Sequence, residues 1–299
     1  LLILDVDNPS SPTVVSTISG GIGEVVISPD GNTAFCVGSG LRIVDITNPR
    51  IPTTKGILDL IGSEKGVALS PDGNTAYIVS GGNSGGNGLH IIDVRDLSNP
   101  ILIGSHTIAS ETKGVTLSAD GSLAYLATSG GGLHIVDVSD SLNSTPLSIY
   151  YSGDTYGFCR RVVLSADGTT AYIPSGYMGL HVVDVSDPAS PTLLGSSPGA
   201  HVTFGEGVTL SPDGKVAYLA AYSEPTPDTG GVYMLDVSDP GNPTLIQKFI
   251  SAQYLKGITI SNDGQTLFTV GSDTVDGNES IRRTLEIIEL NSRYSFSHD

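Results

Sequence analysis

A four-residue phrase recurs along this chain of 299 residues, and its regular spacing restricts the fold more than any other feature. Each copy reads Ser, then Pro, Ala or Asn, then Asp-Gly. The six copies place Asp at positions 30, 72, 120, 167, 213 and 263, which are 42 to 50 residues apart. That period is typical of a four-stranded propeller blade and is too long for a leucine-rich or ankyrin unit. The chain is therefore predicted to be a repeat protein with one blade per copy.

One repeat contains four short apolar runs that alternate with turn residues. Strands are predicted at 114–118, 123–127, 133–138 and 146–150, with a tight turn at 119–121. In that turn Asp can hydrogen-bond the backbone and Gly takes a positive φ. The third run is apolar on both faces, as expected for a sheet packed between two neighbouring sheets.

These repeats predict an all-β protein, a β-propeller of four-stranded antiparallel blades, with six blades favoured over seven. Six blades follow if residues 1–18 complete the blade begun by residues 257–270, which closes the ring by joining the N- and C-terminal strands in one blade. The surplus third strand is then either residues 1–6 or residues 285–290. Seven blades would require about half a blade upstream. We expect a single domain over residues 1–299, and because the chain begins in the middle of a repeat we interpret it as a fragment of a longer protein.

Two phrases resemble a known repeat family. Gly132–Val138 reads GLHIVDV and Gly179–Pro188 reads GLHVVDVSDP, which look like the LVIVD repeat of bacterial and archaeal propeller proteins. The Ser-Pro-Asp-Gly-x-x-Ala-Tyr pattern is also similar to YVTN-type surface propellers. The resemblance implies a secreted or cell-surface protein, with a periplasmic location as the alternative, and it implies no catalytic residues.

The formal net charge of −17 comes largely from the repeat. Seventeen of the 31 acidic residues lie in the Ser-x-Asp-Gly turn, at the end of the third strand or in the turn after it, all on one face that we call the lower face. A solvated face that maintains solubility is the simplest interpretation. Calcium binding is the alternative, and its richest candidate loop, which is predicted on the opposite face, contains Asp273, Asp276, Asn278 and Glu279. Otherwise no cofactor is expected.

The same composition restricts the partners. A chain with this excess of acidic residues is not expected to bind nucleic acid, because phosphate contacts need a basic surface. No run approaches the roughly 20 apolar residues needed to cross a bilayer, so no membrane insertion is expected from this segment. A protein or glycan partner is favoured over a small molecule.

The 14 Lys and Arg residues are fewer but more informative. Five of them lie at the start of the first strand of a repeat: Lys65, Lys113, Arg160, Arg161 and Lys256. In another repeat Glu206 occupies this position. First strands line the central channel, so a ring of charge is predicted around its upper mouth. Such a ring would attract anions. The alternative is that these cations pair with Glu64, Glu111 or Glu206 and hold the blades together.

Aromatic residues are predicted on the same upper face, where the loops vary most in length. The candidates for a peptide or glycan site are Tyr156, Phe158, Tyr177, Phe204, Tyr222 and Tyr254. Variable loops on a rigid scaffold are where binding sites usually occur. The alternative is that these rings only cover the tops of the blades.

His90, His134 and His181 share one repeat position, and equivalent strands are too far apart for these side chains to share a metal ion. Cys36 and Cys159 are expected to be free thiols. No nucleophile elbow, paired acid and base, or phosphate loop is present. We therefore favour a non-catalytic extracellular binding or adhesion propeller over two alternatives, a propeller hydrolase or lactonase with its active site in the funnel and a structural spacer of a surface assembly.

Overall fold

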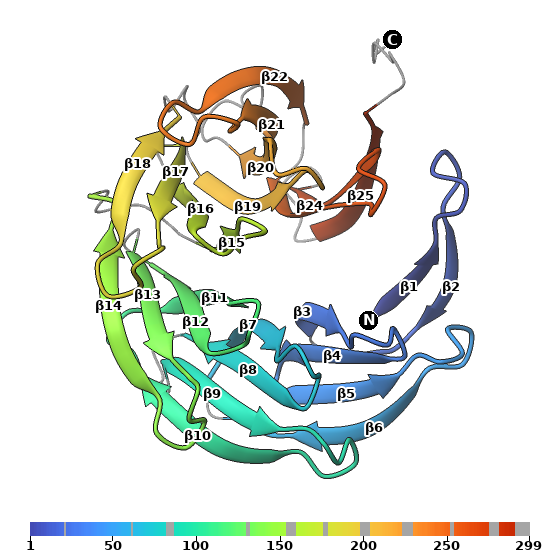
Figure 1. The fold of residues 1–299 in the computed structure, drawn as a ribbon. Coiled ribbons are helices and arrows are strands. Elements are labelled where there is room, and N and C mark those ends of the chain that lie inside the picture. The colour runs from blue at the N-terminus through green and yellow to red at the C-terminus, as the bar shows by residue number, and fades with distance from the viewer. Residues whose placement is uncertain are drawn as a thin grey trace.

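The computed structural model describes residues 1–20, 22–60, 62–81, 87–129, 132–153, 160–175, 179–197, 204–222, 230–251, 254–274 and 281–290. All regular structure in these residues is β-strand, in six blades arranged as a ring (Figure 1), so the predicted all-β propeller of antiparallel blades is confirmed. In the described part of the chain no helix is long and apolar enough to cross a membrane.

Each blade repeats one strand order, from the innermost strand to the outermost. The first blade contains β3 (Ile22–Ile27), β4 (Thr33–Gly38), β5 (Leu41–Asp45) and β6 (Thr53–Leu58). The second contains β7 (Glu64–Leu69), β8 (Thr75–Ser80), β9 (Gly88–Asp93) and β10 (Ile101–Thr107). The third contains β11 (Thr112–Leu117), β12 (Leu123–Thr128), β13 (Gly132–Asp137) and β14 (Thr145–Tyr151).

The second half of the chain follows the same order. The fourth blade contains β15 (Val163–Leu164), β16 (Thr170–Ser175), β17 (Gly179–Asp184) and β18 (Thr192–Ser196). The fifth contains β19 (Phe204–Leu210), β20 (Val216–Tyr222), β21 (Gly231–Asp236) and β22 (Thr244–Ile250). The sixth contains β23 (Tyr254–Ile260), β24 (Thr266–Thr274) and β25 (Ile281–Glu289), and a separate two-stranded sheet contains β1 (Leu2–Asp5) and β2 (Thr13–Thr17).

The hydrophobic core lies between successive sheets. At the interface of the second and third blades, Tyr77 and Val79 of β8 and Leu89 of β9 pack against Ala124 and Leu126 of β12, and all five residues are buried. The second and third strands are therefore apolar on both faces because each face meets a neighbouring blade. Burial of this kind is repeated around the ring and fixes the positions of the first strands at the channel.

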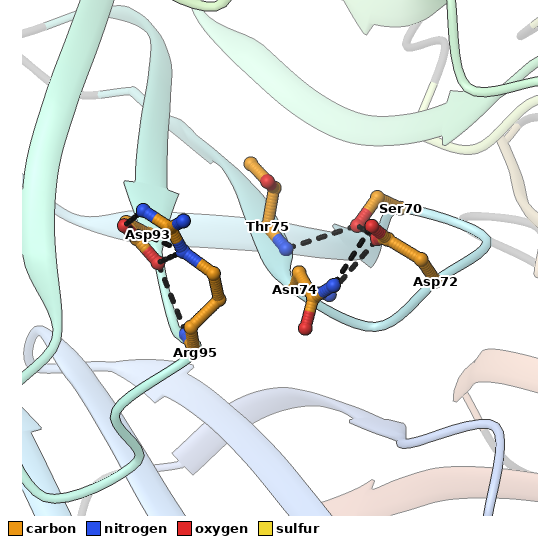
Figure 2. Close-up of polar contacts among 6 residues, drawn as sticks. All are labelled: Ser70, Asp72, Asn74, Thr75, Asp93 and Arg95. Carbon is orange, nitrogen blue, oxygen red and sulfur yellow. Dashed lines mark hydrogen bonds and ion pairs between the residues drawn. The ribbon is translucent and has the colours of Figure 1, made fainter.

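The lower-face turns are built from local hydrogen bonds, as Figure 2 shows for the second blade. The Ser70 hydroxyl donates to Asp72 Oδ1 at 2.6 Å and accepts from the Thr75 amide at 2.9 Å, while Gly73 adopts φ +71°. In the adjacent turn Asp93 Oδ1 accepts the backbone amide of Arg95 at 3.0 Å. The hydrogen bond from Ser70 is the largest cause that lowers the pKa of Asp72. The pKa of Asp93 is lowered to about 2, chiefly by hydrogen bonds from the Arg95 side chain and then by the Arg95 amide. The repeated acids thus serve to shape the turns.

The expected closure of the ring differs from the structure. The third-strand position beside β24 is occupied by β25, with Leu267 opposite Ile288 and Val270 opposite Leu285, so β1 does not join this sheet. The strands β1 and β2 pair only with each other among the described residues. The prediction that the two chain ends share one blade is therefore wrong, because the C-terminal segment 281–289 completes the third-strand ladder instead of residues 2–5.

Candidate functional site: the charged mouth of the central channel

The first strands begin at the upper end of the channel, and their first residues form a compact group of charges. We call this group the mouth cluster and define it as the side chains at the starts of the first strands: Glu24, Glu64, Lys65, Glu111, Lys113, Arg160, Arg161, Glu206 and Lys256. All six residues predicted for the funnel mouth belong to it. Their role in binding stays a prediction.

Two ion pairs connect different blades across this mouth. The guanidinium of Arg161 pairs with Glu24, 137 residues away, which links the segment before β15 to β3. Arg160 Nε lies 2.8 Å from Glu206 Oε2 on β19. The first and fourth blades are separated by two others along the ring, so the Glu24–Arg161 pair spans the channel.

A third pair, between Lys113 Nζ and Glu111 Oε1 at 2.6 Å, joins two residues at the start of the third blade. Lys65 lies close enough to Glu111 to help lower the pKa of that carboxyl, together with the hydrogen bonds from Lys113 and Ser129 that outweigh its burial. Glu64 accepts the Gly40 amide at 2.9 Å, and its other oxygen is buried with no hydrogen-bond partner among the described residues. Most of the cations therefore have acidic neighbours.

Glu206 is the most perturbed carboxyl of the mouth cluster. Only 5% of its surface is exposed, and this burial raises its pKa to about 7, although Arg160, Lys256 and Lys113 act in the opposite direction. Burial also raises the pKa of Glu24, against the attraction of Arg161. Loss of hydration destabilises a carboxylate more than these partly exposed cations stabilise it. The mouth thus contains a carboxyl that changes its charge near neutral pH.

A cavity of ≈ 360 Å³ extends along the channel from this mouth. Glu24 and Arg161 lie at its upper end, and Pro71, Ser118 and Ala119 line it near the lower turns. Its walls are the first strands β3, β7 and β11, which approach closely because Gly66 has no side chain: a Cβ there would lie 2.9 Å from Gly114 Cα. The ion pair therefore lies between this cavity and the upper face.

The predicted aromatic patch lies largely outside the described residues. Tyr156, Phe158 and Tyr177 fall outside them, as do the calcium candidates Asp276, Asn278 and Glu279. Phe204, Tyr222 and Tyr254 are at the upper ends of β19, β20 and β23, where only their backbones are described. Peptide or glycan binding by these six aromatic residues stays a prediction.

Two of the three histidines at the shared repeat position have local hydroxyl partners. His90 Nε2 lies 2.9 Å from the Ser80 hydroxyl, and His181 Nδ1 lies 2.9 Å from the hydroxyl of Tyr150. Burial lowers the pKa of His134. Cys36 is a buried free thiol, whereas Cys159 lies outside the described residues. In the residues that the structure describes, no group of three or more His, Cys, Asp or Glu could hold a metal ion.

The partnership of Glu24 with Arg161 was missed at the sequence level, although a signal for it exists. The signal lies at the position four residues before the Ser of each Ser-x-Asp-Gly turn. This position is Gly in four of the six repeats, and it is Glu24 and Arg161 in the other two. Opposite charges that replace Gly in two repeats indicate a pair, provided that the two repeats face each other across the ring.

This architecture and its channel place the chain in the class of β-propeller proteins. The LVIVD repeat family matches residues 1–19, 25–59, 61–107, 113–148, 161–197 and 228–250, and the chain belongs to this family. The matched segments cover more than half of the chain, and they confirm the resemblance seen in the third-strand phrases. No curated protein sequence matches the chain significantly.

Solved structures share the fold at low sequence identity. A periplasmic gluconolactonase of Pseudomonas aeruginosa, PpgL, is 12% identical with a TM-score of 0.75, over 94% of this chain and 92% of that one. A functionally unknown protein from Desulfotomaculum acetoxidans is 17% identical with a TM-score of 0.71, over 86% and 83%. A putative 6-phosphogluconolactonase from Bacteroides fragilis is 12% identical with a TM-score of 0.74, over 94% and 88%. At these identities the similarity concerns the fold alone.

Proposed function

We propose that this chain is a non-catalytic, extracellular or cell-surface binding module that holds a protein or glycan partner on its upper face, around the mouth cluster. The observation that carries the proposal is the contrast between the two faces. The lower face repeats one hydrogen-bonded turn six times, from Ser28 to Asp30 through Ser261 to Asp263. The upper mouth departs from the repeat, with different charges in different blades.

Departures from a repeat are informative because the fold alone does not require them. A scaffold needs equivalent residues at equivalent positions, whereas a binding site needs a particular arrangement. The mouth cluster offers guanidinium and ammonium groups to an acidic ligand and carboxylates to a basic one. A partner that contacts Lys65 or Lys256 would meet side chains that are not buried.

Binding to an acidic polysaccharide tests this proposal. Polygalacturonate titrated at low salt is expected to bind, and replacing Lys65, Lys113 and Lys256 together by Gln is expected to weaken binding about tenfold, because each lost charge contributes a few tenths of a kcal/mol. Lys215→Gln, in a lower-face turn, is the matched control and should leave the affinity unchanged. An unchanged affinity in the triple variant with unchanged melting would contradict a role for the mouth.

Glu206 supports a second candidate, a hydrolase with its active site in the funnel. A carboxyl with a pKa of about 7 can act as a general base near neutral pH, and two proteins of similar fold are described as a gluconolactonase and a putative 6-phosphogluconolactonase. Hydrolysis of a gluconolactone by the purified chain, with a rate that rises through about pH 7 and is lost in Glu206→Gln, would favour this candidate. Absence of turnover, with and without added divalent cations, would contradict this candidate.

A further inference from the structure

Among the described residues, the ring is incomplete between the sixth blade and the first (Figure 1). The two-stranded sheet β1–β2 lies there, and its sheet has no third or fourth member among the described residues. The strand β1 pairs with β2 on one side only. In the complete blades the strand at this position is paired on both sides, as β13 is with β12 and β14.

The β1–β2 sheet packs as the outer half of a blade. Leu1 and Ile18 contact the buried residues Ala34, Cys36 and Val44 of the first blade. At the interface of the second and third blades, Leu89 has the repeat position of Leu1 and packs together with Ile108 against Ala124, Leu126 and Val136. There, however, Tyr77 and Val79 of the second strand complete the contact. No described residue fills the positions of Tyr77 and Val79 beside the first blade.

The wall of this gap formed by the first blade is apolar and exposed. Val25 of β3 is 42% exposed and Ile27 is 45% exposed. At the repeat position of Val25, four of the other five blades have residues with exposures of 5% or less, Val67, Val162, Val208 and Ile258, and Val115 in the third blade is partly buried. Val25 is apolar like the buried residues at its repeat position. Its exposure therefore results from a missing neighbouring blade.

The wall formed by the sixth blade shows the same difference. Val270 of β24 is 50% exposed, whereas Val37, Val79, Ala127 and Ala220 at the same repeat position are at most 1% exposed. Phe268 and Ile287 are only partly buried, although the corresponding Tyr77 and Ile91 are buried. The gap is therefore bordered by two apolar surfaces, one on the first blade and one on the sixth. A neighbouring blade covers the equivalent surfaces elsewhere in the ring.

We propose that this gap is a docking site for a β-hairpin of the same repeat type, the first two strands of a blade, supplied by polypeptide outside residues 1–299. The second strand of the hairpin would pair with the free edge of β1, and its apolar side chains would cover Val25, Ile27 and Val270. Every second strand of a complete blade is buried on both faces, as β12 is. A polypeptide strand is favoured over a small apolar ligand because it also satisfies the backbone groups along β1.

The repeat register gives a direct test. Leu1 has the repeat position of Leu133, so residues 112–132 of this chain fused directly before Leu1 restore the natural spacing of a blade. Accessibility is followed by maleimide labelling of Val25→Cys and, separately, Val270→Cys in a Cys159→Ser background. The fusion is expected to slow labelling on the order of tenfold at both positions and to raise Tm by about 4 °C or more. A fusion of the same length with Val115 and Tyr125 replaced by Ser is the matched control.

Two further measurements keep the test decisive. If the fusion does not fold, a synthetic peptide of residues 112–128 added to the unmodified chain must give the same protection in a concentration-dependent way. Labelling that stays fast with both the fusion and the peptide would overturn the proposal. It would also be overturned if the chain alone were already protected and dimeric in sedimentation experiments, because a second copy would then occupy the gap.

Discussion

At the scale of single residues, charge and burial at the mouth cluster oppose each other. Glu24 and Arg161 are half-buried partners from distant repeats, and the carboxyl loses hydration that the guanidinium only partly replaces. Glu206 likewise pairs with Arg160 from another repeat, and its carboxyl is more deeply buried than that of Glu24. Ion pairs of this kind stabilise little overall, yet removal of one partner leaves the other charge without compensation.

The first prediction concerns the pair across the channel. Arg161→Met is expected to lower the free energy of unfolding by about 1–3 kcal/mol, because Glu24 then remains as a partly buried carboxylate without its cation. The double variant with Glu24→Gln should recover much of this loss. Urea unfolding of the four proteins of this cycle measures the coupling, and additive effects of the two substitutions would show that the pair does not form in solution.

The second prediction concerns the pH dependence of Glu206. Its pKa is about 7 in the folded protein against an ordinary 4.5, so the folded state binds the proton more tightly and loses stability as pH rises from about 4.5 to 7. Glu206→Gln removes this dependence. Relative to the unmodified protein, the variant should therefore gain about 2–3 kcal/mol between pH 5 and pH 8. The free energies of unfolding are measured by urea unfolding at both pH values. An equal change between pH 5 and pH 8 in the unmodified protein and the variant would contradict the raised pKa.

At the scale of strands and turns, neighbouring blades contact each other through backbone as well as through side chains. Gly104 lies in the outer strand β10, where the lower turn of the third blade approaches it. An added Cβ would lie 2.1 Å from the backbone oxygen of Ser141. Gly56 and Gly195 meet the next blade in the same way, so small residues in the fourth strand set the spacing between blades.

The third prediction tests this contact. Gly104→Ala is expected to destabilise the protein by about 1–3 kcal/mol, because a backbone atom cannot move aside as a flexible side chain can. The matched control is Gly241→Ala, whose added Cβ would meet only Asp239 Oδ1 at 3.4 Å and a more distant oxygen. Thermal melts should show a clear loss for the first variant and little change for the second. Equal losses would indicate that the two blades are not this close.

At the scale of the whole molecule, opposite pH trends act on the two faces. Hydrogen bonds from the neighbouring Ser lower the pKa of all six Asp residues in the Ser-x-Asp-Gly turns, for Asp120 to about 2. Their stabilisation is present above the unfolded value of 3.8 and is lost as pH falls through the lower folded values. Glu206 at the upper mouth behaves in the opposite sense because burial raises its pKa.

The fourth prediction follows from these two trends and from the net charge of −17. Tm should be highest near about pH 5, fall towards pH 2 as the turn carboxylates are protonated, and fall more gently towards pH 8 as Glu206 ionises and the acidic chain repels itself. Differential scanning calorimetry across this range measures the profile. A Tm that rises steadily from pH 5 to pH 8 would contradict it.

The sequence alone determined the features that depend on neighbouring residues. The Ser-x-Asp-Gly phrase predicts its own turn, since Ser70, Asp72 and Gly73 satisfy one another within a few residues. Period and apolar patterning likewise predict the blade and the position of Lys65, Lys113 and Lys256 at the channel mouth. Each of these inferences requires only a local rule that is applied six times.

Only the tertiary structure decided which repeats meet. The pair of Glu24 with Arg161 connects residues 137 positions apart, and the exposure of Val25 and Val270 depends on whether a blade lies between them. The sequence predicts residues 1–18 in the last blade and leaves residues 1–6 and 285–290 open as the surplus third strand, because a local pattern cannot rank them as partners for β24. Both strands carry the third-strand pattern, so the choice depends on closing the ring, and that is a property of all the blades together.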